Sequence, residues 1–168
     1  MSIFEEWCSK IKVIVSEIDG IITEDLLYID ELGNVPFKGF YRKDFDAINE
    51  LKKTFTFVFL SSDNAISYNM CRRKNIPFFH APKNKKNVLI KVMQRYGVSP
   101  EEIIYIGNSY SDVKCLRMIP FSLCPSDAVE DVKSICYHKL SSCGGIGVLE
   151  EVFNLLKHEI IRRKTLDK

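Results

Sequence analysis

The chain has 168 residues, of which 46% are hydrophobic and 27% are charged, so it is long enough to bury a sizeable core in one domain. Its formal net charge is only +2 and both signs are interspersed, which argues against a nucleic-acid-binding stripe or a basic membrane-binding helix. It contains no run of about 20 apolar residues, and its first ten residues are acidic and polar. We therefore expect neither a transmembrane span nor a signal peptide, and a cytoplasmic location.

The first half of the chain predicts strands and helices in alternation. A short lead-in helix is expected at residues 2–10, followed by an apolar run at 12–23 that contains Glu17, Asp19 and a glycine. Such a run is typical of a buried parallel strand that emerges at the carboxyl edge of a sheet, where open α/β sheets bind ligands. Later elements are a helix at 44–53, a strand at 55–60, a helix at 65–73, a strand at 77–80 and a helix at 86–96.

A β-hairpin is expected to be inserted after the first strand, over residues 24–42. Its two arms, LLYID at 26–30 and VPFKGF at 35–40, flank a Gly33-Asn34 turn signal. Apolar residues occur on both arms, and an isolated two-stranded hairpin is only marginally stable. We therefore expect this hairpin to be buried against neighbouring copies in a homotetramer.

The second half continues the alternation. Ser99 and Glu102 predict a capped turn, followed by strands at 103–106, 121–124 and 135–138. Helices are expected at 113–118, at 127–134 with Ser126 as its cap, and at 148–163 after a CGGIG loop. The predicted fold is a single α/β domain over residues 1–168, a three-layer α/β/α sandwich of the Rossmann-like kind with a mainly parallel sheet.

Three of the predicted strands end in polar residues, and a lysine cluster begins the helix at 86–96. Carboxylates, an amide and a lysine at one sheet edge indicate a divalent cation, with Mg²⁺ as the expected ion, that holds a phosphate group. The alternative is that these residues are ordinary turn formers and solvated lysines. The residues are Glu17, Asp19, Ser61, Ser62, Asn108, Ser109, Asp112, Lys83, Lys85 and Lys86.

Six cysteines are scattered without a CxxC pair, so we expect reduced thiols, most of them buried, and no zinc site. They are Cys8, Cys71, Cys115, Cys124, Cys136 and Cys143.

The order of these motifs resembles the haloacid dehalogenase superfamily, in particular its cap-less branch of 3-deoxy-D-manno-octulosonate 8-phosphate phosphatases. The similarity covers roughly residues 11–156. SEIDG stands in the place of the family's DxDG motif, the predicted hairpin in the place of an oligomer-forming hairpin, and YIGNSYSD in the place of YIGDD followed by an acid. PSDA at 125–128 and GGIG at 144–147 match later landmarks.

The resemblance implies site roles, several of them on substituted residues. The family's nucleophile and general acid become Glu17 and Asp19, and a glutamate is one methylene too long for in-line attack. Glu17, Asp19 and Asn108 take the metal positions, with Asn108 in place of an aspartate, so weakened Mg²⁺ binding is expected. Ser61, Ser62 and Lys85, with Lys86 as its nearest rival, take the phosphate-binding positions.

The remaining positions of the resemblance lie beside the metal site or on the side where the substrate binds. Asp112 keeps its carboxylate beside the metal site, whereas Ser109 replaces an aspartate. On the substrate side, Lys43 and Asp44 keep a basic–acidic pair, but Ile146 replaces an arginine that would give bidentate recognition of a carboxylate.

The chain is also similar to the C-terminal domain of animal CMP-sialic acid synthetases, through GNSYSDVKCL. That similarity implies a domain kept for tetramer assembly and regulation. Two functions therefore remain open. One is a weak or silent phosphatase that acts as an oligomeric or regulatory module in sialic acid or octulosonate metabolism. The other is an active Mg²⁺-dependent phosphomonoesterase on a 2-keto-3-deoxy sugar acid phosphate.

Overall fold

Strands from the whole length of the chain meet in one parallel sheet. The computed structural model describes residues 3–62 and 65–166, and within them six strands are arranged in the order β3-β2-β1-β4-β5-β6. Every neighbouring pair is parallel, as the sequence predicted for most of the sheet. The strands are β1 (Val13–Ser16), β2 (Thr56–Ser61), β3 (Phe78–His80), β4 (Ile103–Ile106), β5 (Phe121–Cys124) and β6 (His138–Lys139).

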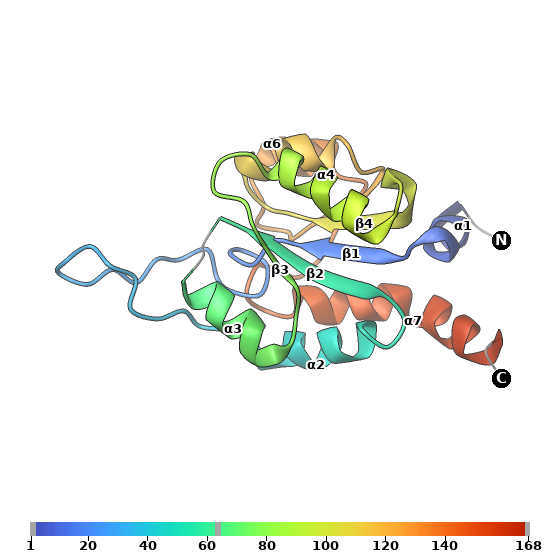
Figure 1. The fold of residues 1–168 in the computed structure, drawn as a ribbon, viewed down its shortest axis with the longest axis horizontal. Coiled ribbons are helices and arrows are strands. Elements are labelled where there is room, and N and C mark those ends of the chain that lie inside the picture. Colours follow the sequence, from blue (N-terminus) through green and yellow to red (C-terminus); the bar gives the residue numbers. More distant parts are fainter. Residues whose placement is uncertain (1–2, 63–64, 167–168) are drawn as a thin grey trace.

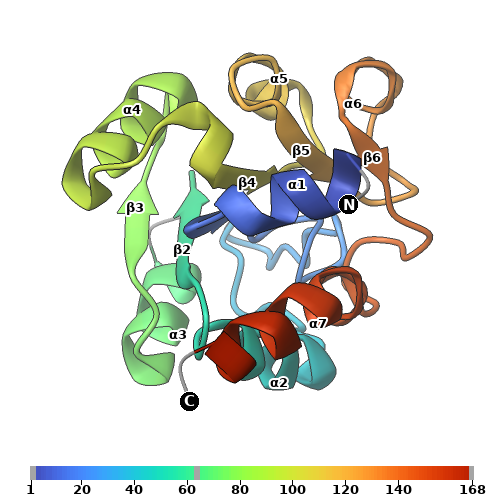
Figure 2. The ribbon, with the colours of Figure 1, turned by 90° about the vertical axis from the view of Figure 1, so that its right-hand side faces the viewer.

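Helices cover both faces of this sheet and complete the predicted three layers. Figures 1 and 2 show α4, α5 and α6 on one face and α2, α3 and α7 on the other. The helices are α1 (Ile3–Lys10), α2 (Arg42–Leu51), α3 (Ile66–Lys74), α4 (Lys85–Tyr96), α5 (Val113–Leu116), α6 (Glu130–Ile135) and α7 (Val148–Leu166), with short 3₁₀ turns η1 (Pro100–Glu102) and η2 (Tyr110–Asp112). No helix in the described ranges is both long and apolar enough to cross a membrane.

The central strand shows why both faces need cover. Successive side chains of a strand point to opposite faces. Ile14 packs into the core beneath α2 and α7, whereas Val13 and Val15 pack into the core on the other face. All four residues of β1 are buried, so it lies in the interior of the protein. The residues that follow β1 therefore leave the sheet at the carboxyl end of a buried strand.

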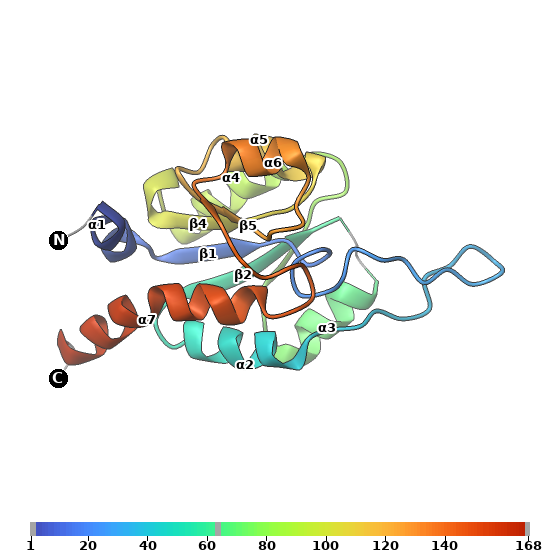
Figure 3. The ribbon, with the colours of Figure 1, turned by 180° about the vertical axis from the view of Figure 1, so that it is seen from behind.

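The predicted hairpin is wrong as secondary structure. Residues 24–41 contain no strand. A turn is present where it was predicted: the Gly33 amide donates to the Asp30 carbonyl at 3.0 Å, and the Asp30 amide to the Asn34 carbonyl at 2.9 Å. Pro36 has no amide hydrogen to give a ladder, and two strands alone are marginal. We call residues 24–41 the arm; it projects away from the end where both termini lie (Figure 3).

Several element boundaries also differ from the prediction, among them those of α6 and β6. Helix α6 begins at Glu130 with Val129 at its cap position, because residues 125–128 instead form a turn in which the Ala128 amide donates to the Pro125 carbonyl. Ser126 therefore caps no helix. Strand β6 begins three residues later than the predicted 135–138 strand, and Ser2 of the predicted lead-in helix lies outside the described residues.

Candidate active site

The carboxyl ends of β1, β2 and β4 place their polar residues at one corner of the sheet. Ser61 is the last residue of β2, and Glu17 directly follows β1. The Glu17 amide donates to the Ile106 carbonyl at the end of β4 at 2.9 Å, which holds the start of the Asn108 loop beside it. The strands thus bring together residues as far apart in the sequence as Glu17 and Asn108, and we call the site around Glu17, Ser61 and Asn108 the corner.

Glu17 lies deep in the corner, with only 3% of its surface exposed. One carboxylate oxygen accepts the Ile18 amide at 2.9 Å, and the other forms an ion pair with Lys85. The Ser61 hydroxyl also hydrogen-bonds this carboxylate. Burial raises the pKa of the Glu17 carboxyl above its usual value, while the Lys85 ammonium and these hydrogen bonds oppose that shift.

Lys85 links two buried carboxylates. It is the first residue of α4, 5% exposed, and its Nζ lies 2.7 Å from an oxygen of Asp112 and in contact with Glu17. Burial opposes its charge, but Asp112 and Glu17 outweigh burial and raise the pKa of the ammonium. Lys83 and Lys86 are exposed, so Lys85 is the lysine of the predicted cluster that enters the corner.

Asp112 has no exposed surface, and its oxygens are fully engaged. One accepts from Lys85 and from the Tyr105 hydroxyl at 2.8 Å. The other accepts the amides of Asn108 and Ser109 at 3.1 and 3.0 Å, together with the Ser109 hydroxyl. Asp112 therefore fixes the loop after β4, and no sequence motif pointed to the participation of Tyr105.

Asp19 is held by a lysine from the arm. Lys38 Nζ lies 2.8 Å from each oxygen of the Asp19 carboxylate, and the Thr23 hydroxyl donates to one of them at 3.2 Å. The Lys38 side chain is only 9% exposed. This ion pair spans 19 residues and joins the arm to the corner. Lys38 was not among the predicted site residues because it is one of many lysines and belongs to no recognisable motif.

Asn108 packs directly on the loop after β1. A Cβ atom on Gly20 would lie 1.9 Å from Asn108 Nδ2, so only glycine fits there. Asn108 Nδ2 donates to the carboxylate of Asp25 at 3.3 Å, a contact that sequence motifs could not reveal. Asn108 Oδ1 is buried and has no hydrogen-bond partner. A carbonyl oxygen of this kind is a ligand that a hard cation accepts.

The corner's donors fit a divalent cation only in part. Asn108 Oδ1 is available, but Glu17 is paired with Lys85 and Asp19 with Lys38. Within the described ranges, no three or more His, Cys, Asp or Glu side chains are grouped so that they could hold a metal ion. The predicted metal residues Glu17, Asp19 and Asn108 thus lie at the same corner. The carboxylates of Glu17 and Asp19 already form ion pairs with lysines.

Of the remaining predicted residues, Ser62 borders a cavity that Asp19 and Lys38 also line, whereas Asp44 and Lys43 lie away from the corner. Ser62 is exposed, and its carbonyl pairs with the His80 ring at 3.1 Å. Asp44 is fully buried at the N-terminus of α7, where it accepts the Leu149 and Glu150 amides at 2.9 and 3.1 Å. Lys43 is exposed beside α7. The structure therefore gives Asp44 the position of a helix cap.

The glycine loop before α7 closes one side of the corner. The Gly145 amide donates to the Ile21 carbonyl at 2.8 Å. A Cβ atom on Gly144 would lie 2.4 Å from the Gly20 carbonyl oxygen, and one on Gly145 would lie 2.4 Å from the Glu24 amide nitrogen. Ile146, the residue in the predicted arginine position, is 53% exposed. The loop thus contacts the segment after β1 through its backbone, and it presents no charged side chain at position 146.

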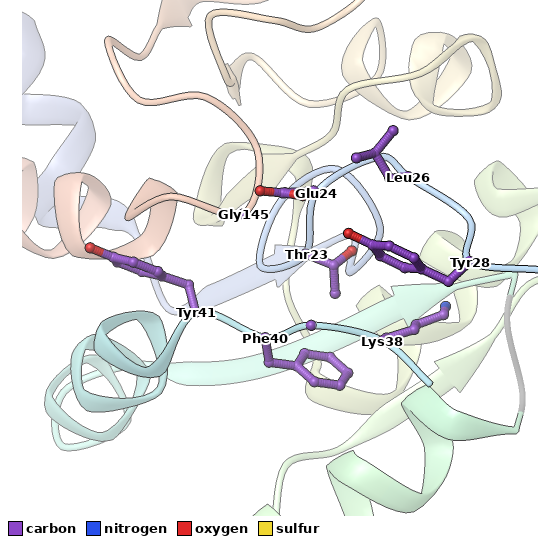
Figure 4. Close-up of a pocket in the computed structure, with 9 residues that line it drawn as sticks. Thr23, Glu24, Leu26, Tyr28, Lys38, Phe40, Tyr41 and Gly145 are labelled. Atoms are coloured by element: carbon purple, nitrogen blue, oxygen red, sulfur yellow. The ribbon is translucent and has the colours of Figure 1, made fainter. Parts of the chain in front are cut away.

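A pocket of about 220 Å³ opens between this loop and the base of the arm. Figure 4 shows its aromatic side chains, together with Lys38, which also holds Asp19. The pocket is thus joined to the corner through Lys38 and Thr23, which both line it and both hydrogen-bond Asp19. It is lined by Thr23, Glu24, Leu26, Tyr28, Lys38, Gly39, Phe40, Tyr41 and Gly145.

Comparison with known proteins gives related results by sequence and by structure. A sequence profile described as haloacid dehalogenase-like hydrolase matches residues 17–151. The 3-deoxy-D-manno-octulosonate 8-phosphate phosphatase of Haemophilus influenzae is 28% identical over 150 residues, which cover 88% of this chain and 83% of that protein. The cobalt-bound structure of the deoxy-D-mannose-octulosonate 8-phosphate phosphatase from the same organism superimposes with a TM-score of 0.84 at 26% identity, covering 90% of each chain.

A second relative is a larger protein. N-acylneuraminate cytidylyltransferase A of Danio rerio is 24% identical over 155 residues, which cover 88% of this chain. The match covers only 36% of the length of that relative.

Proposed function

Because this chain belongs to the haloacid dehalogenase-like hydrolases, we propose that it is a phosphatase-fold protein whose phosphoryl-transfer site is weak or silent. The family membership predicted from SEIDG and YIGNSYSD is confirmed by the profile match. We further propose that the protein acts as an oligomeric or regulatory module in sugar-acid metabolism. The chemistry named for its two relatives, an octulosonate phosphate and an acylneuraminate, supports that substrate class.

One observation carries the proposal: the Glu17 carboxylate contacts Lys85 and Ser61 in a site that is almost closed to water. Lys85 and Ser61 are the residues that the family resemblance assigns to the phosphate group. The longer glutamate side chain thus places its own carboxylate against Lys85 and Ser61, the residues that would bind phosphate. A misplacement of about 1 Å at a reacting centre costs on the order of 100-fold in rate, so Glu17 is a poor nucleophile.

Weak binding of Mg²⁺ is part of the same proposal. The relative of known structure was solved with cobalt, which supports a divalent cation at this corner. In this chain Asn108 contributes a neutral oxygen, and Lys38 and Lys85 compete for the two carboxylates. A hard cation is bound more weakly when an anionic ligand is replaced by a neutral one.

A second candidate is an active Mg²⁺-dependent phosphomonoesterase on a 2-keto-3-deoxy sugar acid phosphate. The unpartnered Asn108 Oδ1 favours it, since that oxygen is free to accept a cation. In this candidate Asp19 is the proton donor, and the pocket beside Lys38 receives the sugar. Lys85 and Ser61 would then bind the phosphate oxygens.

Restoring the family's aspartates at positions 17 and 108 distinguishes between the two candidate functions. The double variant Glu17→Asp, Asn108→Asp should raise Mg²⁺-dependent hydrolysis of sugar phosphates by about 100-fold or more over the natural chain, because the shorter carboxylate and the added charge rebuild the site. The matched control is Glu101→Asp with Asn154→Asp, at two exposed positions. A folded double variant that gains nothing contradicts the proposal.

The arm supports the proposal that the protein is an oligomer. Tyr28 and Phe37 stack with ring centroids 5.3 Å apart, yet both remain about half exposed, and four aliphatic side chains around them are 59–80% exposed. Apolar surface gathered on a projecting segment is typical of an interface. We therefore propose a homotetramer formed through the arm, which light scattering tests; a monomeric mass contradicts it. The aliphatic residues are Leu26, Leu27, Ile29 and Leu32.

A further inference from the structure

Two cysteines lie in direct contact away from the corner's ion pairs. Cys124 is the last residue of β5, and Cys136 follows the last turn of α6. Their sulfur atoms are 2.9 Å apart, within about 1 Å of the bonded separation in a disulfide. The two residues are 12 positions apart and form no CxxC motif, so the sequence did not indicate the pair.

Backbone hydrogen bonds hold both cysteines in place. The Leu140 amide donates to the Cys124 carbonyl at 2.8 Å, and the Cys136 amide donates to the Val132 carbonyl at 3.0 Å. The pair therefore does not depend on a long, freely rotating loop. A bond between the sulfurs would close the loop that contains α6 and fix the start of edge strand β6.

The two thiols differ in access. Cys124 has no exposed surface, whereas Cys136 is partly exposed. The hydrogen bond with Cys124 and the charge of Lys139 lower the pKa of Cys136, which favours its thiolate. By contrast, burial raises the pKa of Cys8 to about 11 and that of Cys71 to about 12. Cys136 is thus the reactive member of the pair, with Cys124 in place to resolve it.

We propose that Cys124 and Cys136 form a redox-active dithiol that small disulfides, such as oxidised glutathione, convert into an intramolecular disulfide. The Cys136 thiolate attacks one sulfur of oxidised glutathione; a mixed disulfide forms and one glutathione thiolate leaves. Cys124 then loses its proton and attacks the Cys136 sulfur, and the second glutathione thiolate leaves. The two protein thiols are oxidised, and one glutathione disulfide is reduced to two thiols.

Cys143 serves as an internal reference. It is the exposed cysteine of the chain, and its sulfur lies 3.2 Å from the Ser126 hydroxyl. No sulfur lies in hydrogen-bonding contact with it among the described residues. Oxidised glutathione should therefore leave Cys143 as a mixed disulfide, while the Cys124–Cys136 pair proceeds to an internal bond.

The test is peptide mapping of the full chain after incubation with oxidised glutathione. Trypsin places the three cysteines on separate peptides, 118–133, 134–139 and 140–157. We expect the first two to be recovered joined, with the loss of two hydrogen atoms, and the third to carry glutathione. Because the bond closes a loop, the oxidised protein should also melt about 5 °C or more higher than the reduced protein.

The variants Cys136→Ser and Cys143→Ser complete the test. Cys136→Ser should abolish both the joined peptides and the rise in melting temperature, and should leave buried Cys124 unmodified. Cys143→Ser should change neither result. Recovery of 118–133 and 134–139 as free thiols when Cys143 is glutathionylated would overturn the proposal. A Cys136–Cys143 bond, or stable glutathione on Cys136 of the natural chain, would do so as well.

Discussion

At the corner, Glu17, Lys85 and Asp112 are at most 5% exposed, whereas in the arm Leu27 is 66% and Leu32 is 80% exposed. The corner is charged and closed, and its partners come from strand ends and from the start of α4. The arm is open and rich in exposed apolar residues, and it reaches the corner through Lys38, which pairs with Asp19, and Asp25, which accepts from Asn108. The difference indicates that the corner is stabilised within one chain, whereas the arm has apolar surface that another molecule can cover.

Removing the lysine at the centre of the corner should have the largest effect. Lys85→Met leaves Glu17 and Asp112 buried without their counter-charge, which should lower the free energy of unfolding by about 3–5 kcal/mol in urea. Lys86→Met, at the exposed neighbouring position, should change it by less than about 0.5 kcal/mol. Equal effects of the two substitutions would mean that the corner is not held by its ion pairs.

A smaller, pH-dependent effect is expected at the helix cap that supports the glycine loop. Burial raises the pKa of Asp44 from 3.8 to about 6, against the hydrogen bonds from the start of α7. The folded state therefore binds more protons than the unfolded state, and this group's stabilisation is complete below about pH 4 and lost as the pH rises through 6. The loss should be about 3 kcal/mol, at about 1.4 kcal/mol for each unit of pKa.

The measurement is urea unfolding at pH 4 and pH 7 for the natural chain, Asp44→Asn and Asp46→Asn. Asp44→Asn should remove the extra fall in stability between the two pH values. Asp46→Asn, at an exposed position of the same helix, should keep it. If the pH profiles of the natural chain and Asp44→Asn coincide, the cap does not titrate as described.

The smallest effect on the folding of one chain is expected in the arm. Leu27→Ser with Leu32→Ser should change the unfolding free energy of the dissociated chain by no more than about 0.5 kcal/mol, because both side chains are already exposed. The same variant should reduce the molar mass in light scattering to that of the monomer. Leu166→Ser, which alters another exposed leucine on α7, should leave the mass unchanged. An oligomer that persists in the double variant would exclude the arm as its interface.

The sequence predicted the sheet and most of the corner because both follow from local patterns. Apolar runs fix where strands end, and parallel strands end at one edge, so Glu17, Ser61 and Asn108 were expected to meet. The contacts of Lys38 with Asp19 and of Asp25 with Asn108 could not be predicted. They depend on how the arm folds back, and no local pattern encodes that path.

The predicted hairpin failed for a related reason. Its alternating apolar residues and its turn signal are real, but a strand ladder needs amide donors and support on one face. Within residues 24–41, which are all described, the turn forms and the ladder does not. Likewise, Asp44 was placed with the substrate from its position after the hairpin, whereas its contacts with α7 depend on a helix that lies more than 100 residues away in the sequence.

The central claim is that the Glu17 carboxylate binds to Lys85 and Ser61, the residues assigned to phosphate binding, and does not act as a nucleophile. The most direct test is hydrolysis of an aryl phosphate and of several sugar-acid phosphates, with Mg²⁺, by the natural chain and by Glu17→Ala. We predict no hydrolysis by the natural chain beyond a background that Glu17→Ala shares. Robust turnover by the natural chain that disappears in a folded Glu17→Ala variant would contradict the claim.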